Sequence, residues 1–97
     1  IETYNETLKD FASNLSERFI KLQNYIKDSN MSDYAVAVHG LKSDCKYLGF
    51  TSFANVSYEH EMKSKDNDAN FIANHFQDLV SEKNKILTII EPYLSKI

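Results

Sequence analysis

Residues that make turns are scarce in this chain, and that scarcity limits the folds open to it. Only two glycines and one proline occur among 97 residues. A sheet of short strands needs many tight turns, which glycine and proline usually supply. We therefore expect a few long helices, and a chain of this length should form one domain over residues 1–97.

Apolar residues recur every three or four positions through four stretches of the chain, which polar residues separate. This spacing predicts amphipathic helices. The predicted helices span residues 7–27, 32 or 33 to 48, 51–65 and 69–90. Residues 1–6 could add a short lead-in helix, and Pro92 disfavours helix at Glu91, so that the last residues should kink or fray. Short connections between such helices favour an all-α, antiparallel up-down four-helix bundle.

The helix ends carry their own signals. Ser32 or Asp33 should cap the second helix, and Thr51 or Ser52 the third, because these side chains accept hydrogen bonds from free backbone N–H groups. Gly49 is well placed to end the second helix in the left-handed conformation.

Charge and composition exclude several classes of function. A net charge of −3 argues against binding to nucleic acid. No apolar run approaches the roughly 18 residues that a membrane span needs, so no direct membrane contact is expected. The one cysteine, Cys45, cannot form an internal disulfide, which favours a cytoplasmic location. The first residue, Ile1, is not methionine, which suggests a domain of a longer protein.

The second predicted helix carries a single histidine, His39, on the side opposite its apolar residues. At 100° per residue, that apolar side holds Tyr34, Val38, Leu41, Cys45 and Leu48. Small and cationic residues lie within about 60° of the histidine on either side, namely Ala35, Val36, Lys42, Ser43 and Lys46. His39 should therefore face solvent, where a partner could approach it closely.

An exposed imidazole beside lysines suits phosphoryl transfer. Free imidazole titrates near pH 6.5, so a neutral ring can act as a nucleophile at pH 7. The transition state spreads its charge over the equatorial phosphoryl oxygens, and nearby cations stabilise it. Lys42 lies one turn from His39 and can reach those oxygens, whereas Lys46 is better placed to steer a partner.

Residues 39–50, HGLKSDCKYLGF, resemble the signature of the histidine phosphotransfer (HPt) domain. The family pattern has a histidine, an aliphatic residue at +2, lysine at +3, small residues after it, and Leu-Gly at +9 and +10. The matching positions are His39, Leu41, Lys42, Ser43, Leu48 and Gly49. The likeness covers essentially the whole chain and implies a monomeric four-helix bundle.

The resemblance implies a phosphocarrier of two-component phosphorelays, with no ATP site and hence no enzyme activity of its own. His39 would accept a phosphoryl group from a receiver-domain aspartate and pass it to another receiver, and Lys42 would stabilise that group. Glu61, 22 residues after the histidine, would orient the imidazole or merely pair with Lys65. Receiver docking would involve Ala35, Val36, Ser43 and Lys46.

The same resemblance implies that the domain itself binds no cofactor, because the required Mg²⁺ belongs to the response-regulator receiver. Many such domains form part of hybrid sensor histidine kinases, so the chain could be tethered to a membrane-bound kinase. His60 stands where the family usually has leucine, and we expect it to pack inward.

A helical interaction or scaffold bundle remains the alternative, since it explains the helices equally well and leaves His39 incidental. A metal-binding bundle is disfavoured, because no glutamate stands three residues before any histidine. The dimerisation helices of a histidine kinase would normally show an acidic residue after the histidine and a nearby proline; Gly40 follows His39 here.

Overall fold

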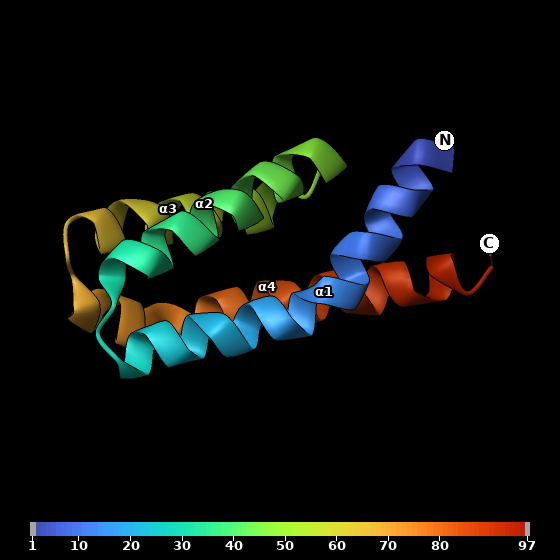
Figure 1. The fold of residues 1–97 in the computed structure, drawn as a ribbon. Coiled ribbons are helices and arrows are strands. Elements are labelled where there is room, and N and C mark those ends of the chain that lie inside the picture. The colour runs from blue at the N-terminus through green and yellow to red at the C-terminus, as the bar shows by residue number, and fades with distance from the viewer. Residues whose placement is uncertain (1, 97) are drawn as a thin grey trace.

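The computed structural model describes residues 2–96, and all of its regular structure is helical within that range. The helices are α1 (Glu2–Lys27), α2 (Met31–Leu48), α3 (Thr51–Lys65) and α4 (Ala69–Leu94). They run alternately up and down, with both ends of the chain at the same end of an elongated bundle of 41 × 18 × 18 Å (Figure 1). The predicted all-α, antiparallel four-helix bundle is thus confirmed.

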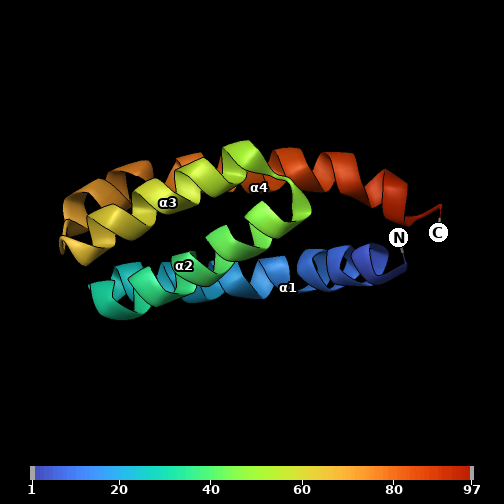
Figure 2. The ribbon, with the colours of Figure 1, turned by 90° about the horizontal axis from the view of Figure 1, so that it is seen from above.

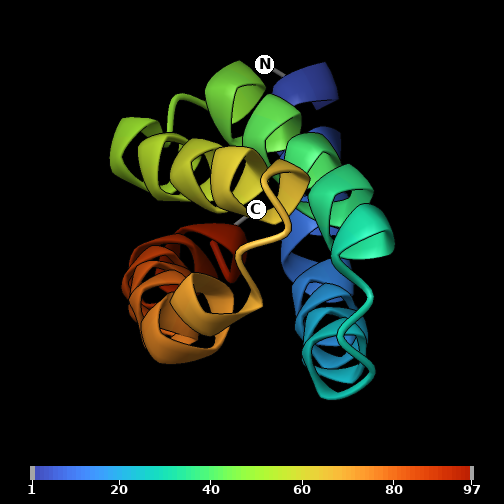
Figure 3. The same cartoon turned by 90° about the vertical axis from the view of Figure 1, so that its left-hand side faces the viewer.

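Each helix packs mainly against two others, in the cyclic order α1, α2, α3, α4, as the view along the bundle shows (Figure 3). The core between them is apolar and strongly aromatic. Phe19 of α1 contacts both Phe53 of α3 and Phe76 of α4, with ring centroids 6.4 and 5.8 Å apart. One continuous core therefore holds all four helices, and α2 and α3 lie side by side along it (Figure 2).

The N-terminal caps of two helices differ from the predictions. α2 begins at Met31, and its cap is Asn30, whose side chain accepts a hydrogen bond from the backbone N–H of Asp33 at 3.2 Å. Ser32 and Asp33 therefore lie inside the first turn. Several polar residues around this point can serve as caps, and the start that occurs here also buries Met31 against the core.

The third helix also lacks the predicted side-chain cap. α3 begins at Thr51 with Phe50 at the cap position, and no side chain bonds to its first N–H groups. Thr51 and Ser52 are therefore wrong as caps. Phe50 instead packs beside Phe11 of α1, with ring centroids 5.8 Å apart. At the start of α4, Asp68 serves as the cap by accepting from the N–H of Phe71 at 3.0 Å.

The two ends of the chain are more regular than the sequence suggested. Among the described residues, 2–6 form no separate lead-in helix but continue α1, where the Tyr4 hydroxyl donates to the Leu48 carbonyl oxygen at 2.9 Å. Residue 1 lies outside the described range. α4 continues through Pro92 to Leu94, so the expectation that Pro92 disfavours helix at Glu91 is wrong. A proline in the last turn forfeits one hydrogen bond, and the Tyr93 hydroxyl anchors this turn by donating to Asn5 Oδ1 at 2.8 Å.

Gly40 lies within α2 and Gly49 directly follows it, and alanine should have opposite effects on stability at these two positions. Gly49 ends the helix with φ of 85°, as predicted, and the next N–H bonds to the Cys45 carbonyl at 2.8 Å. Alanine in that conformation costs about 1–2 kcal/mol, so Gly49→Ala should lower the free energy of unfolding by about that amount. Gly40 has an ordinary helical conformation with open space where a methyl group would lie, so Gly40→Ala should raise it by up to about 1 kcal/mol.

Urea unfolding followed by circular dichroism measures both changes. If both variants change the free energy of unfolding in the same direction, this account of the two glycines is contradicted.

Candidate functional site

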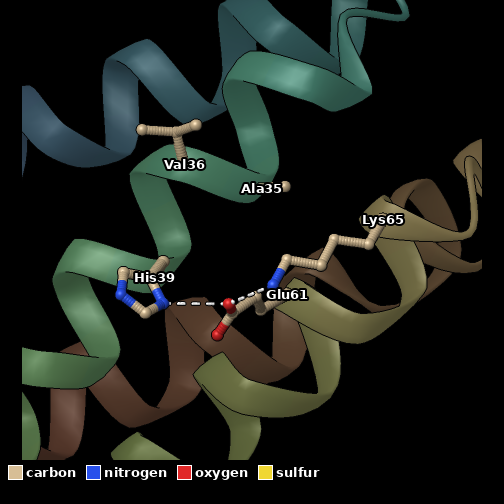
Figure 4. Close-up of a pocket in the computed structure, with 5 residues that line it drawn as sticks. All are labelled: Ala35, Val36, His39, Glu61 and Lys65. Carbon is tan, nitrogen blue, oxygen red and sulfur yellow. Dashed lines mark hydrogen bonds and ion pairs between the residues drawn. The ribbon is translucent and has the colours of Figure 1, made fainter.

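His39 lies at the surface of α2 and contacts a buried carboxylate of the neighbouring helix. Its side chain is 58% exposed, whereas that of Glu61 on α3 is 3% exposed. Nδ1 of His39 lies 2.9 Å from Oε2 of Glu61 (Figure 4). The connection between α2 and α3 is short, so the two helices pack antiparallel and bring residues 22 apart in sequence into contact.

This contact selects the tautomer of the imidazole. An ionised carboxylate only accepts hydrogen bonds, so the nitrogen that faces it must carry the proton. A neutral His39 ring is therefore protonated on Nδ1 and has its lone pair on Nε2. Figure 4 shows that the second ring nitrogen points away from Glu61. The lone pair is thus available on the open side of the ring.

Glu61 is held by three donors at once. Besides His39, its Oε1 accepts from Lys42 Nζ at 2.8 Å and its Oε2 pairs with Lys65 Nζ at 2.9 Å. Burial by itself would raise the pKa of this carboxyl, but hydrogen bonds from Lys42, Lys65 and His39 outweigh it and lower the pKa to about 2. Glu61 is therefore ionised at neutral pH. The sequence left open whether it contacts the imidazole or Lys65, and in the structure it contacts both.

The residues predicted to surround His39 on the surface of α2 are only partly exposed. Val36, Ser43 and Lys46 face solvent, and Val36 is 72% exposed. Ala35 is buried, and the Lys42 side chain is only 13% exposed, with its ammonium 5.2 Å from the centre of the Tyr58 ring. The prediction that these two face solvent is wrong, because α3 packs against that flank of α2.

A shallow hollow of about 280 Å³ opens beside the imidazole (Figure 4). It is lined by Ala35, Val36, His39, Glu61 and Lys65. Its wall therefore combines small apolar side chains with the imidazole and one exposed ammonium. The sequence indicated Lys65 only as a candidate partner of Glu61, and its i,i+4 spacing from that residue was the available signal.

The other histidines have different surroundings. His60 is fully buried, as expected, and its Nδ1 lies 2.8 Å from the Tyr34 hydroxyl. Burial lowers the pKa of His60 to about 4. Nothing in the sequence pattern indicated Tyr34 as its partner. His75 on α4 is exposed and stacks on Phe71, with ring centroids 4.2 Å apart.

Two further groups bear on the chemistry. Cys45 is fully buried, and burial raises the pKa of its thiol to about 12, so it cannot act as a thiolate nucleophile at neutral pH. Among residues 2–96, no cluster of three or more histidine, cysteine or acidic side chains is arranged to hold a metal ion.

Across the described part of the chain, none of the helices combines the length and the apolar character that crossing a membrane requires. Comparison of the sequence and structure with protein-family models, curated proteins and solved structures gave no match.

Proposed function

We propose that this chain is a cytoplasmic phosphocarrier of the histidine phosphotransfer type, and that His39 accepts a phosphoryl group from a receiver-domain aspartate. The observation that carries this proposal is the bond between His39 Nδ1 and the buried, ionised Glu61. That bond fixes the ring and leaves Nε2 as an accessible nucleophile. An incidental surface histidine needs no buried carboxylate behind it.

The proposed transfer is a displacement at phosphorus. The Nε2 lone pair attacks the aspartyl phosphate in line, the Nε2–P bond forms, and the bond from phosphorus to the aspartate oxygen breaks. The aspartate leaves as a carboxylate. The ring becomes positively charged while it keeps its Nδ1 proton, and Glu61 stabilises that charge across 2.9 Å.

The surroundings of His39 suit a domain that must approach closely. Val36 projects into solvent beside the hollow, and the small side chain of Ser43 leaves the approach open. Exposed apolar surface next to a reactive group is typical of an interaction site. The Mg²⁺ that phosphoryl transfer needs would come with the receiver, and Val36, Ser43 and Lys46 would form part of the docking surface.

Incubation of the chain with a phosphorylated receiver domain and Mg²⁺, followed by intact-mass analysis, tests the proposal. We expect a mass gain of one phosphoryl group that is lost in mild acid and survives base, and fragmentation should place it on His39. If several receivers transfer nothing to the folded protein, a helical scaffold bundle becomes the better description.

Glu61 should control the rate of this reaction. Glu61→Ala removes the acceptor of the Nδ1 proton, so the ring can rotate and adopt the other tautomer. A hydrogen bond to a charged group contributes about 1.5–3 kcal/mol, which corresponds to a rate about ten- to hundredfold lower. Glu61→Gln keeps an oxygen that can accept from Nδ1 and should recover part of the rate.

Rapid-quench measurement of phosphoryl transfer gives these rates, and the ¹⁵N shifts of the His39 ring report the tautomer. An unchanged tautomer and rate in Glu61→Ala would show that Glu61 does not position the ring.

A further inference from the structure

The two lysines that bind Glu61 are held very differently. Lys42 is 13% exposed, whereas Lys65 is 56% exposed. They also use different oxygens of the carboxylate, since Lys42 contacts Oε1 and Lys65 contacts Oε2. One lysine is therefore nearly enclosed between helices, and the other has a side chain largely in water.

Lys42 is held in place from two sides. Its ammonium donates to Glu61 at 2.8 Å and lies over the ring of Tyr58, with 5.2 Å between Nζ and the ring centre. An ammonium that leaves this site would give up a mostly enclosed ion pair and a cation–π contact. It would also remove the cation that best compensates the burial of Glu61. This arrangement suits a residue that positions Glu61.

Lys65 can leave Glu61 at lower cost. Its pair with Oε2 is largely exposed, and such pairs contribute only about 0–1 kcal/mol. Its ammonium shares Oε2 with His39 Nδ1, so it already lies beside the imidazole. Lys65 also lines the hollow next to the ring, and its flexible four-carbon stem must carry the ammonium from the Nδ1 side of the ring toward Nε2 to meet a group bound there.

A phosphoryl group on His39 changes the balance of charge. The group carries about two negative charges near neutral pH, whereas Oε2 carries a share of one charge that Lys42 and the ring already compensate. A mobile ammonium at this position interacts more favourably with the phosphoryl oxygens than with Glu61. Glu61 keeps its contacts with Lys42 and the ring after Lys65 has moved.

We propose that Lys65 is the cation that binds the phosphoryl group on His39, and that Lys42 serves to position Glu61. This inference rests on the proposed function. It gives the phosphoryl-binding role to a lysine of α3, whereas the sequence pattern assigned that role to Lys42. It also implies that the site stabilises phosphohistidine only after Lys65 exchanges one partner for another.

A small-molecule donor tests this without a receiver domain. Phosphoramidate can phosphorylate imidazole directly. In this reaction the P–N bond of phosphoramidate breaks, ammonia leaves and the Nε2–P bond forms. The phosphorylated chain is then titrated by ³¹P NMR, and the loss of phosphohistidine is timed at neutral pH. The variants are Lys65→Met, Lys65→Arg and Lys42→Met, with Lys63→Met as the control. Lys63 is on the same helix, but its ammonium lies over Phe71 instead of at the site.

A nearby cation stabilises the phosphoryl dianion, so Lys65→Met should raise the pH midpoint of the ³¹P titration and speed hydrolysis of the phosphohistidine. At the strength of an exposed ion pair, the acid dissociation constant read from the titration and the hydrolysis rate should each change about two- to fivefold. Lys65→Arg should restore the wild-type midpoint, and Lys63→Met should leave it unchanged. Lys42→Met should alter the ¹⁵N signature of the His39 tautomer but not the midpoint.

Three other results would contradict the inference, and each has a different meaning. If His39 is phosphorylated and the midpoint of Lys65→Met equals that of Lys63→Met, Lys65 does not bind the group. If Lys42→Met moves the midpoint instead, the roles of the two lysines are the reverse. If wild type shows no ³¹P signal that depends on His39, the inference and the proposed function both fall.

Discussion

The His39→Gln variant is expected to accept no phosphoryl group from a phosphorylated receiver domain, while the bundle stays folded. A carboxamide offers no nucleophilic nitrogen, so the Nε2–P bond cannot form. The His39 side chain is 58% exposed, and Glu61 keeps both of its lysines in the variant. The ring also donates one hydrogen bond to the buried Glu61 carboxylate, so we expect the free energy of unfolding to fall by at most about 1.5–3 kcal/mol. Intact-mass analysis measures acceptance, and urea unfolding measures stability.

His75 provides a matched control for that experiment. It is also exposed, at 48%, and its Nδ1 also faces a carboxylate, that of Asp78 at 3.4 Å. Asp78 is itself 58% exposed, however, and the ring stacks on Phe71. His75→Gln should accept the phosphoryl group at the wild-type rate. Acceptance by His39→Gln, or its loss in His75→Gln, would overturn the assignment of the acceptor.

The sequence alone could predict the exposure of His39, since that depends only on the angles within one helix. Residues of α2 that are buried, such as Val38, Leu41 and Cys45, lie across the helix from it. The same periodicity predicted four helices, because the apolar residues of each must face one shared core. Local pattern therefore determined the fold class and the side of α2 on which the site lies.

The burial of Ala35 and Lys42 could not be predicted in the same way. A helical projection gives the direction of each side chain but not the position of the neighbouring helix. α3 packs on one flank of α2 and covers these two residues, whereas Val36 on the other flank stays exposed. The two flanks of His39 therefore differ, although the sequence presented them as equivalent.

Contacts between helices were the least predictable part of the site. Tyr34 and His60 are 26 residues apart, and nothing in either local pattern indicates that they meet in the core. The meeting of His39 with Glu61 was expected only through resemblance to a family. Their contact requires a particular register between α2 and α3, which the packing of the whole bundle determines.

The buried His60 leads to the second large expected effect, a loss of stability in mild acid. Burial lowers its pKa to about 4 in the folded chain, against 6.5 for an ordinary histidine. Between these two values the unfolded chain binds a proton that the folded chain does not, so the free energy of unfolding must fall as the pH falls. At 1.36 kcal/mol per pH unit, the loss from this group amounts to about 3 kcal/mol by pH 4.

The surroundings of His60 explain why its ring is not readily protonated in the folded chain. Within residues 2–96, Nε2 of His60 is buried with no hydrogen-bond partner, and Nδ1 faces only the Tyr34 hydroxyl. A protonated ring would bury a positive charge with no carboxylate bonded to it. Glu61 adds a separate loss at lower pH, because its pKa of about 2 lies below the ordinary 4.5. Its contribution is present above pH 4.5 and disappears as the pH falls toward 2.

A double variant, Tyr34→Phe with His60→Leu, isolates the contribution of the buried histidine. Replacing both partners with apolar groups leaves no unpaired polar atom between them, so stability at pH 7 should change little. His39 and His75 remain in both proteins, and their exposed rings contribute equally to each. Urea unfolding between about pH 7 and about pH 4.5 should then show a steep fall for wild type and a much flatter curve for the double variant. Parallel curves would mean that His60 takes up its proton in the folded bundle as readily as in the unfolded chain, and that its burial does not determine the acid stability.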